Sequence, residues 1–124
     1  MTPAEELRAA AERLRELAEA AHGSPWAAIE IPRPGYDLPA WWVEGDHQDP
    51  DGSSTSATVA DCPWGEADAH YIAAMHPGVA TALAKWLEAE AAQPLTAQHG
   101  PRCADDCTTT AALAVARQIL GSTA

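Results

Sequence analysis

The sequence is poor in basic residues and in aromatic residues other than tryptophan. Its 124 residues include seven Lys and Arg against 18 Asp and Glu, a formal net charge of −11, and they contain no Phe and only two Tyr. Non-specific binding to nucleic acid or to anionic lipid requires a basic surface, so this balance argues against both. No apolar run approaches the roughly 18 residues that a membrane span requires, and the polar N-terminus lacks the apolar core of a signal peptide. We therefore expect a cytoplasmic protein.

Apolar residues are nevertheless abundant enough to form a folded core. They make up 47% of the chain, drawn largely from Ala, and five Trp supply most of the aromatic bulk. Charged residues make up 20%, so the composition is that of a globular protein and not of a disordered one. The length corresponds to one domain, and we predict a single small α+β domain over residues 1–124.

Residues 1–22 have the pattern of an amphipathic helix. Thr2 and Glu5 have the spacing of a capping box, with Pro3 in the first turn and Gly23 after the end. One apolar face follows at three- and four-residue steps: Leu7, Ala10, Leu14, Leu17 and Ala21. Such a face packs either on its own domain or on a second copy of itself, and we predict a homodimer on this ground.

The remaining elements follow from changes in periodicity. Residues 26–61 contain three β-compatible segments, separated by a Pro- and Gly-containing break at 32–39 and by a polar run from Gly45 to Ser54. Residues 65–120 return to helical patterns, interrupted at His76-Pro77 because proline suits the first turn of a new helix. The predicted fold is an N-terminal helix, a three-stranded antiparallel meander and two or three C-terminal helices. The N-terminal helix is expected to cover the apolar face of the sheet.

Three cysteines raise the question of a metal site. His99, Cys103 and Cys107 follow one another at four-residue steps, and thiolates and imidazoles are the ligands that zinc favours. A structural zinc site needs a fourth ligand, which would come from elsewhere in the fold: Cys62, His70 or His76. The alternative is that the thiols are free and reduced and that His99 lies at the surface. We favour this alternative and expect no cofactor.

The histidines and acidic residues form no catalytic constellation. Asp68 and His70 are two residues apart on a predicted helix and therefore point in different directions. We interpret both as solvated helix residues and His76 as an N-cap. The sequence contains no glycine-rich phosphate loop, nucleophile elbow or H-E-x-x-H motif, so we expect no enzymatic activity.

The tryptophans are the strongest candidates for binding. Trp41 and Trp42 are adjacent on a predicted strand, so one faces the core and the other faces outward, where it can contact a ligand or a partner. The other three are expected in the core: Trp26, Trp64 and Trp86. The binding site that the sequence predicts comprises Trp41, Trp42 and Arg33.

The order of several short motifs resembles a known family. A helix ending in Leu14–Ala21 is followed by Gly23-Ser24-Pro25-Trp26, by strands, by Val59-Ala60-Asp61-Cys62 and by Asp68–Pro77, which leads into an Ala/Leu helix. This order is similar to that of the Ead-type family of small phage early-region proteins and their relatives in actinobacterial phages and prophages. It departs from the family in the turn at Gly23–Trp26, which lacks the usual threonine, and in the additional Asp/Ser loop. The resemblance implies that Pro25-Trp26 leads the helix into the first strand, and that Asp68, Tyr71 and Ile72 dock the short helix.

The resemblance implies a setting and no chemistry, because no activity is established for the family. We expect a non-enzymatic phage or prophage accessory protein that acts in the bacterial cytoplasm by binding a host or phage protein. The alternative is a small-molecule binder that sequesters a nucleotide defence signal, with Trp42, Arg33 or Arg102 as contacts. The acidic excess is typical of a small soluble protein; mimicry of nucleic acid by carboxylates is the less favoured interpretation.

Overall fold

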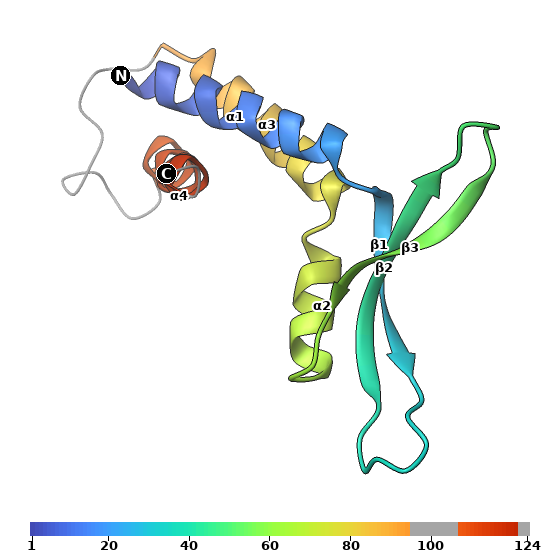
Figure 1. Ribbon diagram of the computed structural model, residues 1–124. Helices are drawn as coiled ribbons and strands as arrows, with labels where there is room; N and C mark the ends of the chain where they lie inside the picture. Colours follow the sequence, from blue (N-terminus) through green and yellow to red (C-terminus); the bar gives the residue numbers. More distant parts are fainter. Residues whose placement is uncertain (95–106, 122–124) are drawn as a thin grey trace. The chain divides into compact units, whose positions relative to one another are not determined.

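The computed structural model describes residues 1–94 and 107–121, and these form an α+β fold (Figure 1). A helix comes first, an antiparallel sheet of three strands follows, and the remaining described elements are helices, as the sequence predicts. The elements in chain order are α1 (Pro3–Ala20), β1 (Gly23–Ile31), β2 (Ala40–Gln48), β3 (Ser54–Asp61), α2 (Glu66–Ala74), α3 (Pro77–Ala91) and α4 (Thr108–Gly121). No helix among the described residues is long and apolar enough to cross a membrane.

The chain divides into two compact units. The sheet unit is Ala18–Val79, and the helical unit is Met1–Leu17 together with Ala80–Ala124. Each unit has its own cluster of buried apolar side chains. A single domain over the whole chain stays a prediction.

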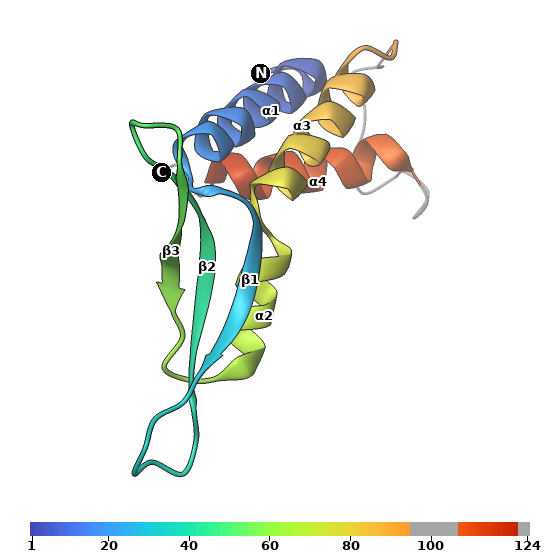
Figure 2. The ribbon, with the colours of Figure 1, turned by 90° about the vertical axis from the view of Figure 1, so that its right-hand side faces the viewer.

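In the sheet unit, β2 lies between β1 and β3, and α2 packs on one face (Figure 2). Val43 of β2 is fully buried in that layer together with Ala69 and Ala73 of α2. The prediction that the N-terminal helix covers the sheet is therefore wrong. Helix α2 follows β3 directly, and its alanine side chains allow a close approach to the strands.

Two strands are longer than the sequence predicted. β1 begins at Gly23, and β2 continues past Gly45 to Gln48, so only residues 49–53 remain as the β2–β3 loop. The polar residues at the end of β2 pair with Ser54–Ser56. Backbone hydrogen bonds are enough to hold such a pair of strands together, and apolar side chains are not required where both faces are solvated. The turn itself is localised by Pro50 and by Gly52, whose φ of 88° favours glycine.

The helical unit is built around the apolar faces of α1, α3 and α4. The buried apolar cluster of its described residues comprises Leu7, Ala10, Ala11, Ala84, Leu87, Ala91, Ala112, Leu113 and Ala116. Ion pairs join its helices. Arg15 pairs with Glu88, with Nε–Oε1 at 2.8 Å and Nη2–Oε2 at 2.9 Å, and Arg117 pairs with Glu6, with Nη2–Oε2 at 3.0 Å. The predicted capping box is confirmed, because the N–H of Glu5 donates to Thr2 Oγ1 at 3.2 Å and the N–H of Thr2 donates to Glu5 Oε2 at 2.8 Å.

The α1 face on which the homodimer was predicted is used inside the chain. Leu7 is 0% exposed, and Leu14 packs against the same cluster, whereas Leu17 is 45% exposed. Leu7 is therefore not available to a second copy. The homodimer itself stays a prediction, but this face does not support it.

Candidate functional site

Trp41 and Trp42 lie on opposite faces of the sheet, as their adjacency on β2 predicts. Trp41 packs with the cluster under α2, and its ring lies 5.4 Å from that of His70, between centroids. Trp42 is paired across the sheet with Ile29 of β1 and Asp61 of β3, on the face that α2 leaves uncovered. The two tryptophans therefore do not form one site, and Trp42 is the one that faces outward.

Arg33 stabilises the β1–β2 loop. Its guanidinium donates two hydrogen bonds to the carbonyl oxygen of Leu38, from Nε at 3.2 Å and from Nη2 at 3.0 Å, and lies 4.9 Å from the centroid of the Tyr36 ring. The N–H of Tyr36 donates to Arg33 O at 3.1 Å, and Gly35 has φ 88°, as expected in a type II turn with Pro34 before it. These contacts account for Arg33 without a bound phosphate.

Of the predicted zinc ligands, His99 and Cys103 lie outside the described residues. Arg102, the predicted nucleotide contact, lies outside them as well. Cys107 precedes α4, where its Sγ accepts a hydrogen bond from the N–H of Thr110 at 3.5 Å, so its thiol acts as an N-cap. Within residues 1–94 and 107–121, no group of three or more His, Cys, Asp or Glu could hold a metal ion.

Cys62 is buried in the apolar cluster of the sheet unit. Burial raises the pKa of its thiol, and the carboxylates of Asp68 and Asp61 raise it further. A thiol with a raised pKa is a weak nucleophile at neutral pH. Cys62 therefore has the character of a core residue.

The histidine interpretations are confirmed where the structure describes them. His76 precedes α3, and its Nδ1 accepts a hydrogen bond from the N–H of Gly78 at 3.1 Å, so it is the N-cap. Asp68 and His70 are exposed, and His70 Nε2 lies 3.4 Å from Glu66 Oε1 one turn away.

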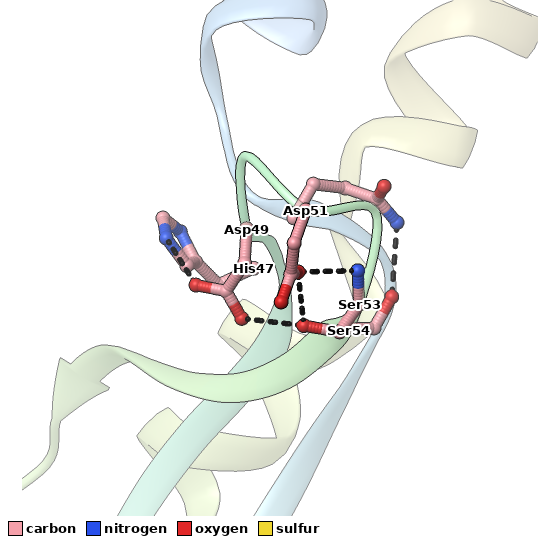
Figure 3. A network of polar contacts seen from close by, with 6 residues as sticks. His47, Asp49, Asp51, Ser53 and Ser54 are labelled. Atoms are coloured by element: carbon pink, nitrogen blue, oxygen red, sulfur yellow. Dashed lines mark hydrogen bonds and ion pairs between the residues drawn. The ribbon is translucent and has the colours of Figure 1, made fainter.

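The β2–β3 loop contains a small polar network (Figure 3). Ser53 Oγ donates to Asp51 Oδ1 at 2.6 Å and lies 3.3 Å from Asp49 Oδ2, while the N–H of Ser53 donates to Asp51 at 2.9 Å. The side-chain hydrogen bond from Ser53, more than any other contact, lowers the pKa of Asp51. His47 Nε2 lies 3.7 Å from Asp49, and Gln48 donates to Ser54 Oγ at 2.9 Å. This network holds the turn in place.

Sequence reasoning missed the outer surface of α2. Trp64, predicted to lie in the core, is 92% exposed, and Tyr71 and Met75 are 72% and 50% exposed. Tyr71 lies on the side of α2 opposite Ala69 and Ala73, Met75 is the C-cap one turn later, and Trp64 precedes the N-cap Gly65; we call these three exposed side chains the α2 aromatic face. The expected docking of the helix by Asp68 and Tyr71 is wrong, because Ala69 and Ala73 make the contact with Ile72 beside them. The helix therefore contacts the sheet through Ala69, Ile72 and Ala73 and exposes Tyr71 to solvent.

Charge is distributed unevenly between the two units. The sheet unit contains ten acidic side chains and one basic one, Arg33, which leaves it a net charge of −9. The rest of the chain contributes the remaining −2. The acidic character of this protein therefore resides in the sheet unit.

Comparison with family models, with curated proteins and with solved structures finds no match to this chain. The resemblance to the Ead-type family stays a prediction from the order of the motifs.

Proposed function

We propose that this protein is a non-enzymatic phage or prophage accessory protein that acts by binding a host or phage protein through the α2 aromatic face. The observation that supports this proposal is the exposure of three large apolar side chains in and next to one short helix: Trp64, Tyr71 and Met75. Aromatic residues and methionine are enriched at protein interfaces, where large rigid side chains bury much area at little entropic cost. Neighbouring large apolar side chains that are exposed together mark an interaction site more often than single ones do.

The alternative of a nucleotide binder receives no support from the described residues. Its expected contact Arg33 already donates hydrogen bonds to the carbonyl oxygen of Leu38 and forms a cation–π contact with the Tyr36 ring. It stays a prediction that concerns Arg102 and Trp42.

Photo-crosslinking in a bacterial host tests the proposal. A photoreactive phenylalanine analogue placed at Trp64 or at Tyr71 should give a crosslinked species of discrete mass. The same analogue at Ala82 or Ala89, both exposed on α3, serves as the matched control and should give none. Because Trp64 and Tyr71 are exposed, their replacement should leave the melting temperature nearly unchanged, so a lost crosslink reports lost binding.

Two outcomes would contradict the proposal. One is the absence of any species heavier than the 13.0 kDa chain at both α2 positions. The other is a crosslinked species of twice that mass containing this chain alone, which would assign the α2 aromatic face to self-association.

A further inference from the structure

The face of the sheet opposite α2 has an ordered chemical pattern that the strand register defines. Along β2, the alternate residues Trp42, Glu44 and Asp46 share this face, while Val43 and Gly45 between them are buried on the α2 side. No helix of the sheet unit lies on this surface (Figures 1 and 2). We call it the open face.

One end of the open face is apolar. Trp42 has Ile29 beside it on β1, and Ile31 pairs with Ala40 one step further along. Each of these large side chains is only partly buried. Partly exposed β-branched and aromatic side chains in a row form an apolar strip, and a second layer packed on this face would bury it.

The other end of the open face is acidic. Asp61 of β3 pairs with Trp42 on the side away from Ile29, and Glu44 and Asp46 follow along β2 at steps of about 7 Å. Arg33, the one Lys or Arg of the sheet unit, is bonded within the β1–β2 loop. None of the three carboxylates forms an ion pair among the described residues.

From this pattern we propose that the open face binds an amphipathic cationic helix of a partner protein. The apolar side of the helix packs on Trp42, Ile29 and Ile31, and its Lys or Arg side chains contact Glu44, Asp46 and Asp61. A helix fits because it satisfies its own backbone hydrogen bonds and can cover a sheet as a second layer. Complementary charge both selects such a partner and speeds its association.

The charge distribution also argues against a second copy of this chain as the occupant. A second copy carries the same net charge of −11. It would bring like charges together, which costs free energy at an interface. The partner is therefore a different, basic protein segment.

A titration followed by NMR tests this proposal with a defined probe. The probe is an 18-residue synthetic peptide of Leu and Lys with helical amphipathic spacing. Added to the isotope-labelled full chain, it should shift the Trp42 indole N–H and the amides of Ile29, Glu44 and Asp46. Combined reversal E44K/D46K should weaken binding about tenfold or more, because like charges replace complementary ones. The reversal E12K/E19K, at two exposed positions of α1, makes the same change in net charge and should weaken it less than twofold.

The outcomes separate specific docking from general attraction to an acidic protein. A scrambled peptide of the same composition should bind at least tenfold more weakly, and a peptide with Glu in place of Lys should not bind. The proposal is overturned if the scrambled peptide binds equally well, if both reversals weaken binding equally, or if the shifts fall on Trp64 and Tyr71. It is also overturned if light scattering shows a dimer of the free chain in which Trp42 is protected from quenchers. Crosslinks from the α2 aromatic face do not depend on these results, so the two proposals fail separately.

Discussion

Replacing Gly45 with alanine would test how closely the sheet unit is packed around Trp26. A Cβ at Gly45 would lie 2.7 Å from Trp26 Cδ1, 2.8 Å from Trp26 Nε1 and 3.1 Å from the carbonyl oxygen of Gly23. The indole cannot move away freely, because its Nε1 donates a hydrogen bond to His22 O at 3.0 Å. The methyl group therefore either displaces the indole and breaks this bond or bends the central strand.

The expected cost combines two opposing contributions. Overpacking of this kind destabilises a protein by about 1–3 kcal/mol. Loss of the indole hydrogen bond adds about 1 kcal/mol. The alanine also restricts the unfolded chain, which offsets up to about 1 kcal/mol. We expect G45A to reduce the free energy of unfolding by about 1–3 kcal/mol and the melting temperature by roughly 4 °C or more.

Urea unfolding followed by far-UV circular dichroism measures this change. The control is G121A at the end of α4, where a Cβ meets nothing within 4 Å, and it should alter stability by less than about 0.5 kcal/mol. A double-mutant cycle with W26A identifies the cause, because G45A should cost little once the indole is absent. An equal cost of G45A with and without Trp26 would refute the reasoning.

Three further predictions concern burial and titration. Leu87 is 0% exposed in the helical unit, so L87A should reduce the free energy of unfolding by urea by about 2–5 kcal/mol. L17A, at a position that is 45% exposed, should reduce it by less than about 1 kcal/mol, and similar costs for the two variants would contradict the described core. The Cys62 thiol should react with iodoacetamide far more slowly in the native protein than in urea. Because burial raises the pKa of this thiol, the stability of the native protein should fall as the pH rises past the unfolded-state pKa near 9. Rapid alkylation of the native protein, measured by mass spectrometry, would contradict the burial of Cys62. The hydrogen bond from Arg15 lowers the pKa of Glu88. The stability that this pair contributes is therefore present above the unfolded-state pKa of 4.5 and is lost as the pH falls through the native pKa. R15Q should remove this part of the pH dependence of unfolding, and a pH profile unchanged by R15Q would contradict the prediction.

Features that depend on residues close together in the chain were predictable. The capping box of Thr2 and Glu5 and the N-cap at His76 involve hydrogen bonds that reach two or three residues. Proline at position 77 begins a helix because its fixed φ suits the first turn. The number and order of strands followed from alternation, although the polar end of β2 was mistaken for loop because its pairing relies on backbone groups.

The candidate surfaces were less predictable because they depend on which faces meet. That Trp41 and Trp42 point to opposite sides follows from the geometry of a strand, but the sequence does not say which side is covered. The register placed Asp61 and Ile29 on either side of Trp42, although they are 32 positions apart in the chain. Trp64 was expected in the core on hydrophobicity alone, and no local signal distinguishes a core tryptophan from an exposed one.

The sequence by itself determined the α+β order, the helix starts and the acidic charge, because these depend on short-range hydrogen bonding, steric limits and composition. Only the tertiary structure decided that α2, and not α1, covers the sheet. Alanines on α2 permit a close approach to Val43, while Leu7 of α1 reaches its full burial against α3 and α4. That choice leaves Trp64, Tyr71 and Met75 exposed in and next to α2, and it leaves Trp42 on the face of the sheet opposite that helix. Which large apolar side chains remain available for binding was therefore settled by packing between distant segments, which periodicity does not encode.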